Sequence, residues 1–174
     1  MPGSLVAVAA NIFRPDDEEH NAHRIKNVQL ANFEEETVET NPGGSIAKST
    51  VAVGIMEPTV EFAFEGADPD DLRDFMRTGT GSLQTYTVYE VFRDSLTGEE
   101  VNRITEVTGR MQSVNRAQFE RGNMGETSYK IGQVSLYTEE FRGAQRIKYD
   151  RQNQILVVDG EDRFSEQRRL LGIG

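Results

Sequence analysis

Alternating hydrophobic and polar residues recur along the chain and predict a protein built mainly of β-strands. In Thr59–Glu65, the residues Val60, Phe62 and Phe64 alternate with Glu61, Ala63 and Glu65. This period of two is typical of a strand with one buried face. Similar strand-like patterns occur at Val28–Thr40, Ser45–Met56, Gln84–Arg93, Arg103–Phe119, Thr127–Phe141 and, for a short strand, within Tyr149–Val158. The fold class is therefore mainly β, of a sandwich-like or barrel-like kind.

One segment, residues 67–78, has a clear helical pattern. Asp68 is a candidate N-cap and Pro69 fits the first helical position, where its missing N–H costs nothing. Leu72, Phe75 and Met76 then share one helical face. The sequence predicts a short helix here, and Arg163–Leu171 allows a second one at the end of the chain.

The chain shows no linker, repeat or low-complexity tract, and we expect a single domain over residues 1–174. Residues 1–26 have no regular pattern and are expected to be irregular. The turn signal Asn41-Pro42-Gly43-Gly44 joins two strand patterns into a long hairpin over 28–56. The Gly-rich stretch Arg121–Gly125 joins a second long hairpin over 101–141.

The second hairpin is longer than a compact domain of this size. About 17 extended residues in Arg103–Phe119 span roughly 50 Å, whereas the domain should be about 40 Å across. The hairpin must therefore bend or project. Neither of its faces, one with Thr105 and Ser113 and the other with Glu106 and Gln112, has the composition of a core, and this favours projection.

Long polar strands leave open edges, which pair readily with other chains. Copies that join edge to edge into a closed ring would remove those edges and could line a water-filled channel. The alternative is a curled monomeric β-sandwich with bulges at Gly109 and Gly132. Both readings remain open on the strand pattern alone.

Composition and charge exclude several classes of function. The chain has no cysteine, which rules out a disulfide scaffold, a thiolate zinc site and a cysteine nucleophile. No apolar run reaches the length of about 20 residues that a membrane helix needs. The net charge is −10, and residues 1–75 hold 15 of the 29 acidic but only 5 of the 19 basic residues. Such a chain is unsuited to gripping nucleic acid through its phosphates, but it could form a surface that repels it.

The candidate chemical motifs do not indicate catalysis, a cofactor or a metal. His20 and His23 follow an acidic cluster and are read as part of a solvated loop. Asp68, Asp70 and Asp71 fail as a calcium loop because Arg73 and Gly79 stand where glycine and glutamate are needed. We therefore expect no catalytic, cofactor-binding or metal-binding residue. Tyr86, Tyr89 and Tyr129 could form a sugar-binding platform, although core or interface packing is the simpler reading.

The C-terminal quarter carries a series of spaced residues, namely Asp150, Asn153, Asp159-Gly160-Glu161-Asp162, Phe164, Arg168 and Leu171-Gly172-Ile173. Further motifs precede it in order, namely Val28-Gln29-Leu30, Gly43-Gly44, Gly54-Ile55-Met56, Gly66-Ala67-Asp68-Pro69 and Gly122–Glu126 followed by Lys130-Ile131. From Asn11 onward the chain resembles the major tail tube proteins of contractile-tailed bacteriophages, the FII-like family that includes R-type tailocin tubes. It departs from them at Thr40–Ser45, which replaces a Tyr-Arg-Gly-Gly-Gly-Met loop.

The resemblance implies a structural virion protein and no enzyme. Family members form hexameric rings in which each subunit gives two long hairpins to a shared β-barrel, and the rings stack into a tube that guides DNA ejection. The implied partners are further copies of the chain, the contractile tail sheath protein, baseplate and tail terminator proteins, and a tape measure protein in the lumen. DNA would pass without specific binding, no membrane would be involved, and assembly would take place in the cytoplasm of the host bacterium.

Strand alternation and the resemblance together nominate residues for assembly. The lumen-facing candidates are Glu34, Glu36, Glu106, Gln112 and Gln133. The candidates for ring stacking or other subunit contacts are Asn41, Pro42, Gly43, Gly44, Gly122, Asn123, Met124, Arg163, Arg168 and Arg169; the three arginines could instead form surface salt bridges. The alternative function is that of a monomeric β-sandwich binding module, for instance a carbohydrate-binding domain.

Overall fold

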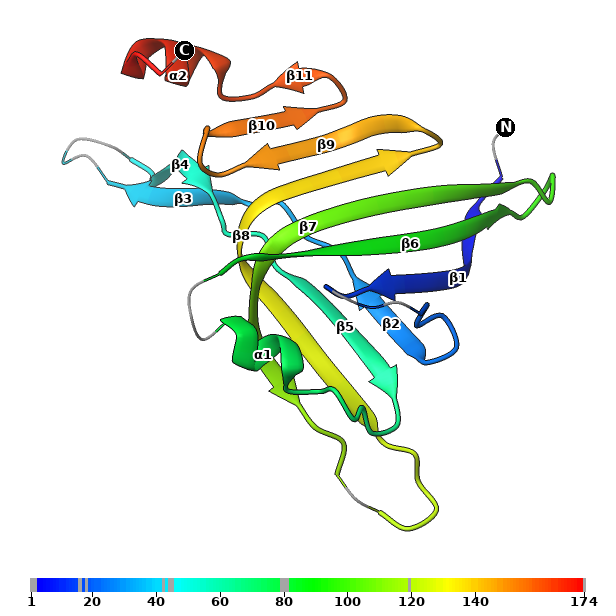
Figure 1. Cartoon of the computed structure of the whole chain (residues 1–174). Helices are drawn as coiled ribbons and strands as arrows, with labels where there is room; N and C mark the ends of the chain where they lie inside the picture. Colours follow the sequence, from blue (N-terminus) through cyan, green and yellow to red (C-terminus); the bar gives the residue numbers. More distant parts are fainter. Residues whose placement is uncertain are drawn as a thin grey trace.

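The structure is a computed structural model that describes residues 3–15, 17, 19–41, 43, 46–78, 82–118 and 120–173, except for the side chains of 74, 77 and 78. It confirms that the protein is mainly β (Figure 1). The elements are β1 (Leu5–Phe13), β2 (Ile25–Gln29), β3 (Glu35–Thr40), β4 (Ser49–Ile55), β5 (Val60–Glu65), α1 (Arg73–Thr78), β6 (Gln84–Asp94), β7 (Glu100–Asn115), β8 (Glu126–Phe141), β9 (Ala144–Asp150), β10 (Ile155–Val158), β11 (Glu161–Asp162) and α2 (Ser165–Leu171).

One large antiparallel sheet organises the molecule. Its main path runs β1-β6-β7-β8-β9-β10-β11, and β5 pairs with both β8 and β2. Strand β8 therefore serves two parts of the sheet, because its first half pairs with β5 and its second half pairs with β9. Strands β3 and β4 form a separate two-stranded sheet, which extends from the body at the upper left of Figure 1.

The long hairpin β7–β8 bends sharply in the middle. The register between the two strands shifts on both sides of Gly109–Met111, and Gln133 opposite has a positive φ of 49°. A Cβ atom on Gly109 would lie 2.8 Å from Ile131 Cγ2 and 2.9 Å from the carbonyl oxygen of Gly132, so only glycine fits this approach. The hairpin therefore curves around the core, and only its tip beyond Asn115 projects (Figure 1).

The core lies on the inner side of this bend. It includes Ile12, Val60, Phe62, Phe64, Tyr86, Val88, Val107, Met111, Tyr129, Ile131, Val134 and Tyr137. Phe62 and Tyr129 stack with ring centroids 4.7 Å apart. The expectation that neither face of β7 is a core face was wrong, since Thr105, Val107 and Met111 are fully buried. Thr105 lies on the buried face of β7 although threonine is typical of exposed strand positions. For this reason the sequence pattern did not reveal which face of β7 is buried.

Four further expectations need correction. Residues 1–26 are not irregular throughout, because β1 pairs with β6 along its length. Strand β9 was not foreseen. The pattern at 28–40 is broken between β2 and β3. The helix begins at Arg73 rather than at 67, because turns occupy the preceding residues; there the Asp68 carboxylate accepts from the Asp70 N–H at 3.2 Å and also binds Arg14. The helical face with Leu72, Phe75 and Met76 is exposed.

Candidate functional site

A four-stranded part of the sheet combines a buried face with a polar outer face. It consists of β2, β5, the first half of β8 and the second half of β7. Its inner face carries core residues such as Phe62 and Tyr129. On its outer face one row crosses all four strands, namely Gln29, Glu61, Lys130 and Ser113, which are successive register partners. An open depression of about 590 Å³ lies over this polar face.

The charges on this face are largely paired within the subunit. Lys130 Nζ lies 3.2 Å from Glu61 Oε1. At the end of the sheet Lys26 Nζ lies 2.7 Å from Glu126 Oε2, and this ion pair raises the pKa of Lys26. Asn115 Nδ2 donates weakly to Ser128 Oγ at 3.4 Å. The face is thus hydrophilic without an excess of positive charge.

The outer edges of this four-stranded part are open in the sense that no further strand pairs with them among the described residues, although α1 contacts β7 and β1 contacts β2. Strand β6 pairs with β7 only as far as Gly109, so Arg110–Asn115 has no strand on its other side within the described part of the chain. Within the same described residues, strand β2 pairs with β5 and with no second strand. Each edge presents unpaired backbone N–H and C=O groups, which other strands can bind. The arrangement can therefore be extended on both sides by further copies.

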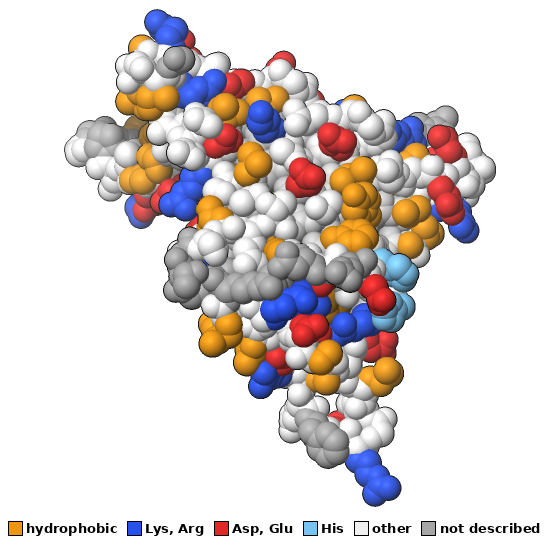
Figure 2. Space-filling view, in the orientation of Figure 1, with side chains coloured by type: hydrophobic (Ala, Val, Ile, Leu, Met, Phe, Trp, Pro, Cys, Tyr) orange, Lys and Arg blue, Asp and Glu red, His pale blue; other side chains and the backbone are white. Residues whose placement is uncertain are grey.

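The β3–β4 hairpin is exposed on both faces. Val38 and Val51, which are register partners, and Val53 are each half-exposed. A lone two-stranded hairpin is only marginally stable in water, so this element gains stability when another surface covers it. Figure 2 shows hydrophobic side chains at the upper left, where Figure 1 places β4 and α2.

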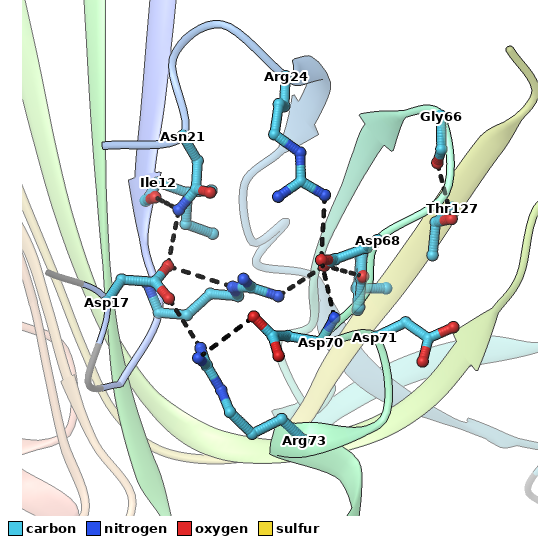
Figure 3. Close-up of polar contacts among 12 residues, drawn as sticks. Ile12, Asp17, Asn21, Arg24, Gly66, Asp68, Asp70, Asp71, Arg73 and Thr127 are labelled. Atoms are coloured by element: carbon cyan, nitrogen blue, oxygen red, sulfur yellow. Dashed lines mark hydrogen bonds and ion pairs between the residues drawn. The ribbon is translucent and has the colours of Figure 1, made fainter. Parts of the chain in front are cut away.

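A buried ionic cluster fixes the segment after β1 to the sheet and to the turn before α1 (Figure 3). Its centre is Asp68, whose side chain is fully buried. Arg14 Nη1 donates to Asp68 Oδ2 at 2.7 Å, the Tyr129 hydroxyl donates to the same oxygen at 2.6 Å, and Arg24 Nη2 lies 3.0 Å from Asp68 Oδ1. Both guanidinium groups also lie over the Phe64 ring.

Asp17 forms the second centre of this cluster. Its carboxylate accepts hydrogen bonds from Arg14, Asn21 and Arg73, the last at 2.7 Å. Asn21 also donates to the carbonyl oxygen of Ile12, which ties the loop back to β1. The acidic loop expected to be solvated is therefore partly buried, although His20 and His23 are exposed, with ring centroids 5.8 Å apart.

The cluster shifts the pKa values of its members. Burial alone would raise the pKa of Asp68, but the hydrogen bond from Tyr129 and the contacts with Arg24 and Arg14 outweigh it and lower that pKa. The pKa of Asp17 is lowered in the same way, because Arg73, Arg14 and Asn21 offset its burial. Burial and the neighbouring Asp68 raise the pKa of Tyr129. At neutral pH the cluster holds two carboxylates and three guanidinium groups.

Comparison with known proteins identifies the family. The family model of phage tail tube protein FII matches residues 9–172. The chain belongs to this family. It is a structural protein and not an enzyme. A search of curated sequences gives no significant match.

Solved structures share the fold of this tail tube protein at low sequence identity. A chain in the six-fold symmetrised baseplate of the anti-feeding prophage aligns with a TM-score of 0.52 at 10% identity, covering 76% of this chain and 91% of that one. A chain in the sheath/tube terminator of the PVC extracellular contractile injection system, in its extended state, gives 0.51 at 10% identity, with 75% and 92% covered.

The motif residues at the C-terminal end of the tail tube protein have structural roles. Asp150 caps a turn by accepting hydrogen bonds from the backbone and the side chain of Asn153. Asp159 and Gly160 both have positive φ, as a tight hairpin turn between β10 and β11 requires. Asp162 binds Arg168. Together they fold the β9–β11 segment and seat α2.

The five lumen candidates are all exposed, but they do not form one cluster. Glu34 and Glu36 lie at the β3–β4 hairpin, Glu106 lies on the first half of β7, and Gln112 and Gln133 lie near the bend. Their role in the tail tube protein remains a prediction.

The sequence analysis did not predict the polar row of Gln29, Glu61, Lys130 and Ser113. The alternation within β5, with Glu61 next to Phe62, was a signal for it.

The candidates for subunit contacts lie at both ends of the tail tube protein. Asn41 and Gly43 are exposed beside the β3–β4 turn, whereas Pro42 and Gly44 lie outside the described residues. Gly122, Asn123 and Met124 form the tip beyond β7. Near α2, Arg168 and Arg169 are engaged by Asp162 and Glu166, which favours surface salt bridges for these two. Arg163 is exposed.

Two further observations on the described residues concern metal ligands and membrane-spanning helices. Within them no group of three or more histidine, aspartate or glutamate side chains is placed to hold a metal ion. No helix in the described part of the chain is long and apolar enough to cross a membrane.

Proposed function

We propose that six copies of this chain form a ring and that rings stack into a tail tube. The observation that carries this proposal is the four-stranded part of the sheet with a polar outer face and two open edges. Pairing of the β7 edge of one copy with the β2 edge of the next would repeat around the ring and close into a barrel without edges. The apolar faces would stay inside each subunit.

The polar outer face would then line the lumen. Glu61, Lys130 and their neighbours offer hydrogen-bonding groups but no net positive surface for phosphates to bind. Because binding of DNA to proteins is driven largely by counterion release at basic groups, a lumen of this composition lets DNA slide. The acidic candidate Glu36 would strengthen this effect at the hairpin end of the ring, whereas Glu34 lines a groove at that end of the molecule. DNA ejection through the tube follows as the function.

The proposed partners correspond to the two ends and the outside of the tube. The similar chains come from structures described as a baseplate and as a sheath/tube terminator, and this chain would contact proteins of both kinds. A contractile sheath would surround the outer surface, and a tape measure protein would occupy the lumen before ejection. The tube would be part of the virion tail and would assemble in the cytoplasm of the host bacterium.

Size-selective labelling of assembled tubes tests the lumen assignment. The chain lacks cysteine, so Glu61→Cys on the polar face and Leu96→Cys in the exposed turn after β6 each introduce a single thiol. A small maleimide should label both variants. A maleimide attached to a folded protein wider than the lumen should label Leu96→Cys and leave Glu61→Cys unmodified. Equal labelling of both by the large reagent would overturn the assignment.

A further inference from the structure

An apolar groove lies at the end of the molecule that carries β3, β4 and α2. Its volume is about 570 Å³. The base of the β3–β4 hairpin forms one wall, with Phe33 and Val53, and β10 with the start of α2 forms the other, with Leu156 and Phe164. Because both walls carry apolar side chains, the groove can bind an apolar side chain of another molecule.

A protruding tip lies at the opposite end, beyond β7 and β8 (Figure 1). Met124 at this tip is 68% exposed. The tip has a defined shape, because the Asn123 N–H donates to the carbonyl oxygen of Glu120 at 3.1 Å and the Gly125 N–H donates to Asn123 Oδ1 at 3.1 Å. The Gly125 carbonyl oxygen accepts from the Gly66 N–H at 3.1 Å, which anchors the tip to the segment after β5. Met124 is thus held outward by a preorganised turn, so little order is lost when it binds.

We propose that the tip of one copy, residues 120–125, seats in the groove of the next copy, with Met124 between Val53 and Phe164. The proposal rests on the tube function proposed above and assigns the contact between successive rings. Tip and groove are different surfaces at opposite ends of one chain. A contact of this heterologous kind leaves a free tip and a free groove after each addition, so it continues into an open stack rather than closing a dimer.

The charges around the two surfaces are complementary. Arg121 on the tip is exposed. Glu34 and Glu35 line the hairpin side of the groove, while Arg163 lines the α2 side. Arg121 can therefore face the two glutamates, and its neighbour Glu120, whose carboxylate also accepts from Asn123 Nδ2 at 3.0 Å, can face Arg163. Complementary charges fix the orientation of the docked tip and disfavour other pairings.

Cross-linking between two different variants tests the contact directly, because the natural chain has no thiol. Met124→Cys and Val53→Cys are purified separately, mixed under assembly conditions and treated with a short bis-maleimide. The mixture should give cross-linked dimers, and neither variant alone should. The matched control mixes Leu96→Cys with Val53→Cys, since Leu96 is 72% exposed and lies away from the tip. Tubes that form without the Met124–Val53 cross-link would overturn the proposal.

A charge exchange provides the second test. Arg121→Glu should raise the protein concentration needed for stacking about tenfold or more, because like charges then meet, while single rings still form. Combining it with Glu34→Arg and Glu35→Arg should restore stacking. Stacking that is insensitive to Arg121→Glu would contradict the proposal. Absence of rings in the unaltered protein would instead refute the tube function itself, so the two failures are distinguishable.

Discussion

Replacement of Asp68 by alanine should destabilise the folded subunit strongly. The side chain is fully buried and is bound by Arg14, Arg24 and Tyr129 at 2.6–3.0 Å. Asp68→Ala leaves two guanidinium groups close together without their shared carboxylate. Arg14 is nearly as buried as Asp68, and it also pairs with Asp17. The loss therefore combines missing hydrogen bonds with buried positive charge that has lost one of its carboxylates.

The expected cost is about 3–5 kcal/mol of unfolding free energy, the range for removing one partner of a buried ion pair. A domain of this size has a total stability of roughly 5–15 kcal/mol. Since 1 kcal/mol corresponds to about 2–4 °C of Tm in a domain of this length, the Tm should fall by about 6–20 °C. The loss of local order should be largest in the loop between β1 and β2, because the ionic cluster attaches this loop to the sheet.

Urea unfolding followed by circular dichroism, under conditions where the subunit is monomeric, measures this change. Asp70→Ala is the matched control, because Asp70 lies in the same turn, is half-exposed and approaches Arg73 only to 3.8 Å. The control should change stability by less than about 1 kcal/mol. If Asp68→Ala and Asp70→Ala cost the same, the cluster does not hold the fold as described.

Two further predictions concern acid and the bend of the long hairpin. Because the pKa values of Asp17 and Asp68 are lowered in the folded state, their stabilisation is complete above the unfolded pKa of about 3.9 and is lost as the pH falls through the lower folded values. Unfolding titrations should show stability decreasing below about pH 4, and less steeply in Asp68→Asn; equal slopes would contradict the assignment. Gly109→Ala should cost about 1–3 kcal/mol by overpacking against Ile131 and Gly132, whereas Gly54→Ala, with only one atom nearby at 3.9 Å, should cost little in the same urea assay.

The parts of the fold that could be predicted from the sequence are those in which local pattern and burial agree. Strand β5 has one fully apolar face, so its alternation reports its environment directly. Strand β1 has no such pattern, because it is an edge strand whose first half is exposed on both sides. In β7 the buried face contains Thr105 and Gly109, which resemble surface residues in the sequence, and the bend that buries them depends on contacts with β8.

The site was predictable only in outline. Open edges and polar strand faces follow from the length and composition of the two hairpins. The ionic cluster could not be predicted, because Arg14 and Asp68 are 54 residues apart and only the completed sheet brings them together. For this reason the sequence analysis interpreted the acidic loop before His20 and His23 as a solvated loop. Likewise, the groove between β4 and α2 arises from elements more than 100 residues apart in the sequence, and no local pattern marks it.

Electron microscopy of the concentrated, purified protein tests the central claim most directly. We expect hollow six-fold rings and tubes with a stain-filled lumen, in which the β7 edge of each copy lies beside the β2 edge of its neighbour. Folded single subunits that form no ring at any concentration would contradict it.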